Sequence, residues 1–317
     1  MTATLAAPLA RPKSRPAPGP VLAALSTPFR AEDLYRIDLA AMASHARWLL
    51  ASGCDGLLVF GTTGEAASCS LAERLEALEA LIGEGIDPTR LLVGTGLCSA
   101  AETITLTRHA ARLKTAGALL LPPFYYKGVG LEGLRRHFAA VIAACGEELP
   151  PIYLYHIPKV SGVPLGPEVI GALLAEHGEA IAGVKDSSGD FANTSEVLER
   201  FPRLAVFVGS ETPFLSARQA GATGVISASV NIQPQAVGAL AAGWRGSQAQ
   251  DLQTAASKVR ARLEAAGPLV VSTKAALAAI HGSAAWARPR PPLLPLDGAE
   301  AERLAWDLRE LGLAGLA

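Results

Sequence analysis

The sequence predicts an α/β protein of the (β/α)8 TIM-barrel class with a C-terminal helical extension. From Pro20 onward, short β-rich runs that end in Gly, Pro, Ser or Thr alternate with longer helical segments rich in Ala, Leu, Glu and Arg. The alternation repeats eight times before Trp244, which favours a closed parallel barrel over a doubly wound sheet. No GxGxxG turn follows the first run, as a dinucleotide-binding sheet would require.

The strand candidates are short β-rich runs, each bounded by turn-forming residues. They are, in chain order, Val21–Thr27, Gly56–Gly61, Leu91–Gly96, Ala118–Leu121, Ile152–Tyr155, Ile181–Lys185, Ala205–Gly209 and Gly224–Ser227. The helix candidates that follow them repeat apolar residues at helical spacing. They are Leu39–Ser52, Leu71–Gly83, Ala100–Ala116, Leu131–Ala144, Pro167–Glu176, Thr194–Arg200, Pro213–Ala220 and Gln233–Trp244.

We expect three regions along the chain. Residues 1–19 are rich in Ala, Pro and Arg, and Pro8 breaks their short apolar part, so a disordered arm is expected rather than a secretory signal. Residues 20–245 are expected to form the catalytic barrel. Residues 246–317 contain no convincing strand and are expected to form a helical domain, interrupted by the Pro-rich linker Arg288–Pro295.

Composition argues against several classes of function. The chain has 317 residues, 50% of them hydrophobic, and a formal net charge of −1, so nothing electrostatic favours nucleic acid or an anionic membrane surface as partner. No uncharged apolar run reaches the roughly 20 residues that a bilayer span needs. The 4 cysteines contain no CxxC pair and the 6 histidines no HxH or HExxH pattern. We therefore expect a reduced, cytoplasmic protein without a metal site.

The reactive side chains of such a barrel lie where strands end and loops begin. The second strand runs into Gly61-Thr62-Thr63-Gly64-Glu65. Its glycines permit a tight turn, in which backbone N–H groups and the following helix N-terminus would suit a carboxylate. The threonine hydroxyls would be able to relay a proton to a neighbouring tyrosine. The alternative is an ordinary turn that leads into a helix cap.

Two other loops carry weaker signals. The fourth strand leads into PPFYYK, residues 122–127, whose aromatic pair suits a substrate lid, a subunit contact or packing beneath a loop. The seventh strand leads into Gly209-Ser210-Glu211, where the carboxylate would bind a substrate hydroxyl or cap the next helix.

The fifth and sixth strands place a tyrosine beside a lysine. Alternation puts Tyr153 and Tyr155 on one face, with Tyr155 near the rim, where a phenol can pass protons or merely fill a barrel layer. The sixth strand ends at Lys185, and Gly183 leaves room beside it. Burial disfavours the ammonium form of a lysine, and the usual reason for burying one is a nucleophilic amine that forms an imine with a ketone. The alternative is a lysine that pairs with Asp186 and closes the barrel.

Together, these segments place a lysine, a tyrosine, an anion-binding turn and two hydroxyls at one end of the barrel. GTTGE, PPFYYK, YHIP-x-x-SG and GVKDSSGD, in that order and spacing, resemble the dihydrodipicolinate synthase/N-acetylneuraminate lyase family. The resemblance covers about Val21 to Trp244 and extends to the helical tail. It implies a class I, pyruvate-handling aldolase on a TIM barrel, without metal or organic cofactor, assembled as a homotetramer that is a dimer of dimers.

The resemblance also carries catalytic roles onto matching positions. Lys185 corresponds to the lysine that forms the imine with pyruvate or another 2-oxo acid, and Tyr155 to the general acid/base for that imine. Thr62 and Thr63 match the pair that holds the pyruvate carboxylate and links the proton relay.

The remaining matches lie at the subunit contact and the pocket wall. Tyr126 matches a tyrosine that reaches into the neighbouring subunit's relay, with Tyr125 as the alternative. Gly209 and Ile226 match positions that line the pocket.

One position departs from the pattern of dihydrodipicolinate synthases proper. Those enzymes carry an arginine two residues after the proline of the YHIP segment, and it holds the carboxylate of aspartate semialdehyde. Here that position is Val160, which cannot supply a bidentate partner for a carboxylate. Strand alternation is expected to point the neighbouring Lys159 to the other side.

The sequence therefore predicts a Schiff-base-forming lyase that makes or breaks a C–C bond between pyruvate, or another 2-oxo acid, and an aldehyde. Glu211 is a candidate contact for a hydroxyl of that aldehyde. The alternatives are 4-hydroxy-tetrahydrodipicolinate synthase proper, a 2-oxo-3-deoxy sugar-acid aldolase or dehydratase, and, from a different class, a barrel that binds a 2-oxo acid without turnover.

Overall fold

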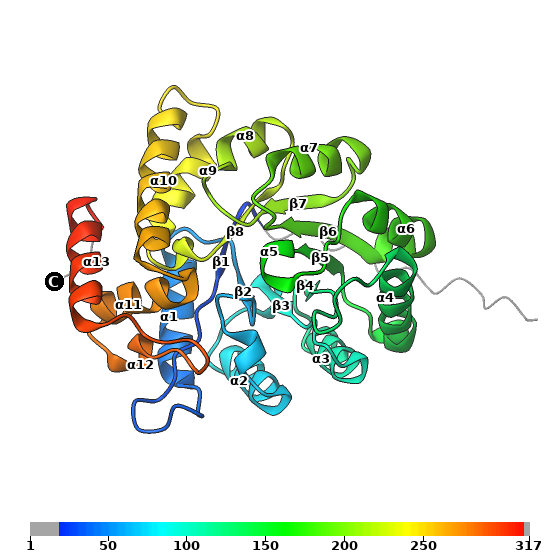
Figure 1. Cartoon of the computed structure of the whole chain (residues 1–317), viewed down its shortest axis with the longest axis horizontal. Coiled ribbons are helices and arrows are strands. Elements are labelled where there is room, and N and C mark those ends of the chain that lie inside the picture. Colours follow the sequence, from blue (N-terminus) through cyan, green and yellow to red (C-terminus); the bar gives the residue numbers. More distant parts are fainter. Residues whose placement is uncertain (1–18, 314–317) are drawn as a thin grey trace, which may run out of the picture.

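The computed structural model describes residues 19–313, and the arm predicted over residues 1–19 lies outside them except for Gly19. Eight parallel strands form a closed barrel in the order β1-β2-β3-β4-β5-β6-β7-β8, and β8 returns to pair with β1. Helices surround the barrel, and further helices follow it at the C-terminal end of the chain (Figure 1). The predicted fold class is confirmed.

The strands overlap all the predicted runs. They are β1 (Val21–Ala24), β2 (Gly56–Val59), β3 (Leu91–Gly94), β4 (Gly117–Leu120), β5 (Ile152–His156), β6 (Ile181–Asp186), β7 (Ala205–Val208) and β8 (Gly224–Ser227). The first three end two or three residues before their predicted ends, and β4 and β7 end one residue before theirs. For β2 the cause is local, because Phe60 has φ 58° and so leaves the extended conformation.

The helices between strands begin and end close to the predicted positions. They are α1 (Leu39–Ala51), α2 (Leu71–Gly83), α3 (Ala100–Arg112), α4 (Leu131–Cys145), α5 (Pro158–Ser161), α6 (Pro167–His177), α7 (Phe191–Arg200), α8 (Phe214–Gln219) and α9 (Pro234–Gly243). Side-chain caps account for several of these starts. Ser70 and Glu73 form a capping box at α2, and Asp190 caps α7 by accepting from the Ala192 N–H. The four-residue helix α5 was not predicted.

Apolar side chains fill the inside of the barrel and the layer around it. The interior core contains Leu22, Leu58, Leu92, Leu119, Tyr153, Phe207 and Ile226. Strand residues of the other parity pack outward against the helices, as Val59 and Val93 do. This filled interior leaves the carboxyl ends of the strands as the place for a site.

Four helices follow the barrel, namely α10 (Ala249–Ala266), α11 (Leu269–His281), α12 (Ala284–Ala287) and α13 (Gly298–Glu310). They share a core that includes Leu263, Leu277, Trp286 and Leu308. Figure 1 shows α10, α11 and α13 grouped beside α1. Within residues 19–313, no single helix is long and apolar enough to cross a membrane; α10 and α11 meet that criterion only as a pair, bent by 109°.

Candidate active site

A cavity of about 1000 Å³ opens at the carboxyl ends of the barrel strands. Its wall is formed by loops that follow strands on several sides of the barrel and by the start of α11. Six residues predicted for the site line it, namely Thr62, Thr63, Tyr155, Lys185, Gly209 and Ile226. This volume lies at the upper end of the range for small-molecule sites, so two small substrates fit together.

Lys185 and Tyr155 lie side by side at the floor of the cavity. The register of β5 and β6 pairs them directly, and each side chain is 4% exposed. The Lys185 Nζ lies 4.4 Å from the centroid of the Tyr155 ring. Gly183 is needed nearby, because a Cβ there would lie 2.3 Å from the Ala205 carbonyl oxygen.

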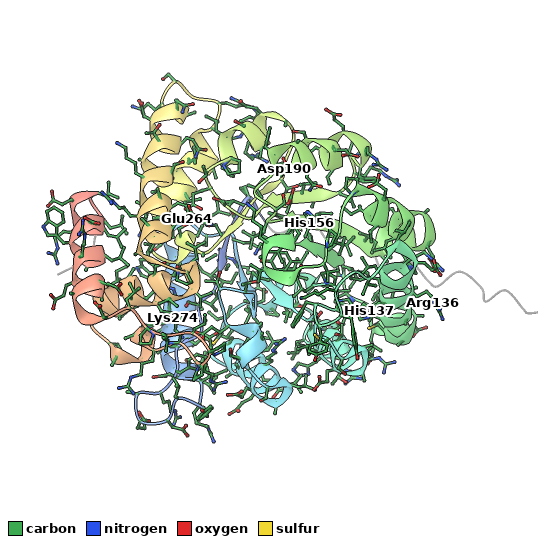
Figure 2. The ribbon with its side chains drawn as sticks, viewed as in Figure 1. Arg136, His137, His156, Asp190, Glu264 and Lys274 are labelled. Atoms are coloured by element: carbon green, nitrogen blue, oxygen red, sulfur yellow. The ribbon has the colours of Figure 1, made fainter. Side chains whose placement is uncertain are left out.

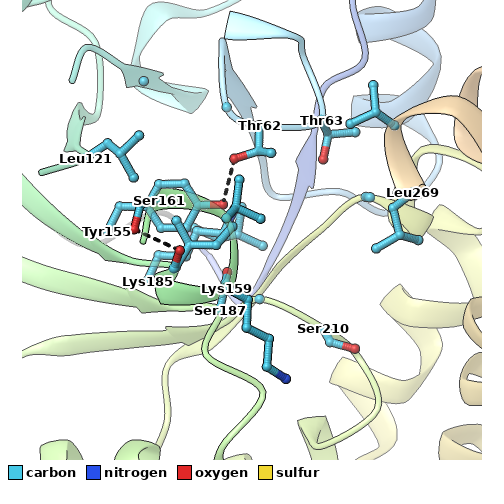
Figure 3. A pocket seen from close by; sticks show the side chains of 18 of the residues that line it. Thr62, Thr63, Leu121, Tyr155, Lys159, Ser161, Lys185, Ser187, Ser210 and Leu269 are labelled. Carbon is cyan, nitrogen blue, oxygen red and sulfur yellow. Dashed lines mark hydrogen bonds between the residues drawn. The ribbon is translucent and has the colours of Figure 1, made fainter. Parts of the chain in front are cut away.

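The Tyr155 hydroxyl is linked to Thr62. The two oxygens lie 3.3 Å apart, and the contact is drawn as a dashed line in Figure 3. Burial alone would raise the pKa of Tyr155, but the Lys185 ammonium and hydrogen bonds with Thr62, Lys185 and Ser187 lower it below its ordinary value. Such a phenol is suited to exchange a proton with the lysine nitrogen.

The threonine turn is held by contacts beneath it. The Thr27 hydroxyl donates to the Gly64 carbonyl at 2.7 Å, and a Cβ on Gly64 would lie 2.8 Å from the Leu25 carbonyl oxygen. Thr63 lines the cavity, but the contact with the Tyr155 hydroxyl is made by Thr62. The predicted helix N-terminus does not follow directly, since a three-residue 3-10 turn, Ala66–Ser68, precedes α2.

Glu211 is not a substrate contact in this structure. Its side chain is fully buried and lies outside the cavity wall. Its carboxylate accepts hydrogen bonds from Ser229, from the Ser227 hydroxyl at 2.6 Å and from the Gln233 amide at 2.7 Å. The sequence prediction for Glu211 is therefore corrected. Its oxygens are occupied by side chains from β8 and the segment that follows it.

The aromatic pair after β4 lies outside the cavity wall. Tyr125 and Tyr126 are 74% and 73% exposed, and their rings meet edge to face at 5.3 Å. Neither lines the cavity, whereas Phe124 does. The assignment of Tyr126 to a neighbouring subunit's relay stays a prediction.

Lys159 and Val160 both line the cavity, contrary to the expectation for Lys159. That expectation extended strand alternation beyond the end of the strand. The strand β5 ends at His156, and α5 carries the next residues through one helical turn, in which neighbours are not on opposite faces.

Sequence reasoning missed residues that act from far along the chain. Lys274 on α11 forms a buried ion pair with Glu65, and the Arg290 backbone N–H donates to the same carboxylate at 2.7 Å. Nearer to the predicted residues, Ser187, two positions after Lys185, contributes a hydrogen bond to Tyr155. Among residues 19–313, no group of three or more His, Cys, Asp or Glu side chains is arranged to hold a metal ion.

Comparison with known proteins gives consistent matches along nearly the whole chain. The model of the dihydrodipicolinate synthetase family matches residues 17–311. A 4-hydroxy-tetrahydrodipicolinate synthase of Kineococcus radiotolerans is 37% identical over 319 residues, covering 99% of this chain and 97% of that protein. An uncharacterized DapA-like lyase of Chloroflexus aurantiacus is 33% identical over 293 residues, covering 90% and 95%.

A solved structure agrees with the fold over nearly the whole chain. It is YagE, a prophage protein of the dihydrodipicolinic acid synthase family from E. coli K12, in complex with pyruvate. The TM-score is 0.85 at 26% identity, and the alignment covers 93% of this chain and 99% of that one.

Proposed function

The chain belongs to the dihydrodipicolinate synthetase family and is a carbon–carbon lyase of the aldolase type, and we propose that it works through an imine between Lys185 and pyruvate or another 2-oxo acid. The observation that carries this proposal is the position of the Lys185 Nζ, 4.4 Å from the ring of Tyr155 at the floor of the cavity. The pyruvate bound by the related YagE supports the choice of 2-oxo acid.

The proposed reaction begins when the Lys185 amine adds to the ketone carbon and the carbonyl oxygen leaves as water, which gives an iminium. Loss of a proton from the adjacent carbon yields an enamine. That carbon attacks the aldehyde carbon, and the aldehyde oxygen takes up a proton. Water then adds to the new iminium, releases the product and restores the amine; the reverse sequence cleaves the same bond.

Tyr155 is proposed to move the protons in these steps. Its lowered pKa and its contact with Thr62 support a role as general acid and base, with the Thr62 hydroxyl passing the proton onward. Thr62 and Thr63 are proposed to hold the carboxylate of the 2-oxo acid. No metal or organic cofactor enters these steps, since the iminium itself accepts the electron pair.

A second candidate is 4-hydroxy-tetrahydrodipicolinate synthase activity, which the likeness to the Kineococcus radiotolerans synthase favours. Val160 weighs against it, because its side chain offers no hydrogen bond to the carboxylate of aspartate semialdehyde. A 2-oxo-3-deoxy sugar-acid aldolase or dehydratase would use the same imine.

We also propose that the protein is a cytoplasmic homotetramer, a dimer of dimers. The exposed rings of Tyr125 and Tyr126 support a subunit contact at the loop after β4. The four cysteines are free, as a reducing compartment requires.

Imine trapping tests the proposal. Borohydride reduction with pyruvate should add mass to the peptide that contains Lys185, and the Lys185→Arg variant should gain none. A panel of aldehydes and 2-oxo sugar acids, assayed for pyruvate consumption or release, would then identify the reaction. Absence of an adduct at Lys185, or full aldol activity in Lys185→Arg, would contradict the proposal; an adduct without turnover on any aldehyde would indicate a binding protein.

A further inference from the structure

The acidic side chains that line the cavity are already engaged by the protein. Glu65 pairs with Lys274. Asp186 accepts from the Asn193 amide at 2.8 Å and from the Thr194 hydroxyl at 2.7 Å. The other two acids, both labelled in Figure 2, are Asp190, which caps α7, and Glu264, which pairs with Arg260.

One of the four cationic side chains of the wall differs in this respect. The Arg260 guanidinium is held by Glu264, and Arg74 donates to the Ala66 carbonyl. Lys185 lies at the floor against Tyr155. Lys159 alone among these four cations makes no hydrogen bond, ion pair or ring contact with any residue between 19 and 313. The exposed Lys159 ammonium in the cavity wall is therefore free to bind a ligand.

The Lys159 ammonium lies against the loop that follows β6, the strand that carries Lys185. Tyr155 pairs with Lys185 across β5 and β6. Four residues beyond each of them, the Lys159 Nζ lies over Gly189, 2.9 Å from the position that a Cβ would occupy there. Figure 3 shows the Lys159 side chain extending from α5 toward the side of the cavity where Ser210 lies.

The turn that carries Lys159 is braced at its end. The Ser161 hydroxyl donates to the Ile157 carbonyl at 3.0 Å and accepts from the Val163 N–H at 3.1 Å. The Lys127 Nζ donates to the Ser161 carbonyl at 2.6 Å, which ties α5 to the loop after β4. A fixed backbone beneath a free ammonium lowers the entropy lost when that ammonium binds a ligand.

We propose that Lys159 is a specificity-determining residue that binds an anionic group, a carboxylate or a phosphate, on the aldehyde partner. The inference rests on the proposed function, since it assumes that the 2-oxo acid is held at Lys185 below. It places the charged end of the aldehyde at the cavity mouth, over Gly189, and its carbonyl carbon toward the enamine. If Lys159 binds a carboxylate, Val160 no longer weighs against aspartate semialdehyde as the aldehyde partner, because the charge comes from the neighbouring residue of the same turn.

The test compares three aldehydes, each with pyruvate as the 2-oxo acid. Succinic semialdehyde carries a carboxylate, glyceraldehyde 3-phosphate a phosphate, and glyceraldehyde no charge. For the wild-type protein, kcat/KM should be higher for at least one of the two charged aldehydes than for glyceraldehyde. Whichever charged aldehyde is preferred identifies the anion.

In Lys159→Gln, the ratio of kcat/KM between the preferred charged aldehyde and glyceraldehyde should fall by about tenfold to a hundredfold. Lys258→Gln is the matched control, because Lys258 is exposed on α10 outside the cavity wall, and its ratio should equal that of the wild type. Trapping of pyruvate at Lys185 is measured on the same preparations. Absence of a pyruvate adduct at Lys185 in the wild type would contradict the proposed function. If pyruvate is trapped but the wild type shows no preference for a charged aldehyde, or Lys159→Gln keeps the wild-type ratio of kcat/KM values, only the role of Lys159 is overturned.

Discussion

Lys274 on α11 and Glu65 in the loop after β2 form an ion pair in which both side chains are completely buried. Glu65 belongs to the same turn as Thr62 and Thr63, and its backbone lies in the left-handed region with φ 51°. The C-terminal helices thus hold the turn that lines the floor of the cavity. Burial lowers the pKa of Lys274 to about 8, although the neighbouring Glu65 favours its charged form.

Replacing Lys274 with methionine should destabilise the protein by about 3–5 kcal/mol, because the Glu65 carboxylate would stay buried without its cation. Chemical denaturation at pH 7 measures the free energy of unfolding. The double variant Glu65→Gln/Lys274→Met removes both charges and should be more stable than Lys274→Met. A single variant as stable as the wild type would show that the pair does not hold the turn.

The sequence was sufficient to predict the barrel and the two residues that lie at the floor of the cavity. Lys185 and Tyr155 were predictable because strand periodicity and a family motif agree, and the two strands are adjacent in a sequential barrel. The α5 turn was not predictable, since a four-residue helix leaves no periodic signal in the sequence. The position of Lys159 was therefore predicted by extending strand alternation beyond His156, where β5 ends.

Contacts between distant segments also lay beyond the sequence. Glu65 and Lys274 are 209 positions apart, and no sequence pattern near either residue identifies the other as its partner. The same holds for Glu211, whose partners come from β8 and the segment after it. From the sequence alone, a carboxylate next to a strand end is interpreted as a substrate contact, because the side chains that surround it are unknown.

Glu211→Gln tests the corrected role of this residue. The substitution removes the charge that strengthens its hydrogen bonds with Ser227, Ser229 and Gln233, so we expect a loss of about 1.5–3 kcal/mol in the free energy of unfolding. The preference of the enzyme between hydroxylated and unhydroxylated aldehydes should not change, because the carboxylate does not reach the cavity. A selective rise in KM for hydroxylated aldehydes would restore the original prediction.

Tyr155→Phe should lower kcat by about 10²–10⁴-fold, because the ring that packs against Lys185 stays while the proton-transferring hydroxyl is lost. Tyr153→Phe is the matched control on the same strand. Tyr153 lies outside the cavity wall, and burial raises its pKa to about 12, so its hydroxyl is not placed for proton transfer. Equal losses of activity in the two variants would indicate a packing effect and argue against the relay.

His45 should make the protein sensitive to acid. Complete burial, followed by the nearby His281, lowers the pKa of His45 from 6.5 to about 3, although a hydrogen bond with Asn231 opposes the shift. Its Nε2 lies 3.2 Å from the Asn231 amide oxygen, its Nδ1 lies 3.0 Å from His281, and Trp48 and Trp286 pack against its ring. The folded protein therefore keeps this imidazole neutral at a pH where the unfolded chain protonates it.

The unfolded state binds the extra proton between pH 6.5 and about 3, so the contribution of His45 is fully present above pH 6.5 and falls as the pH drops through that window. The loss is at most about 1.4 kcal/mol for each pH unit. His45→Gln removes the titrating group, so the free energy of unfolding of this variant should fall less steeply than that of the wild type from pH 6.5 to 4. The comparison of slopes holds even where the two proteins differ in stability at pH 7.5. Parallel curves for the two proteins would mean that His45 binds its proton equally in both states and that the acid sensitivity lies elsewhere.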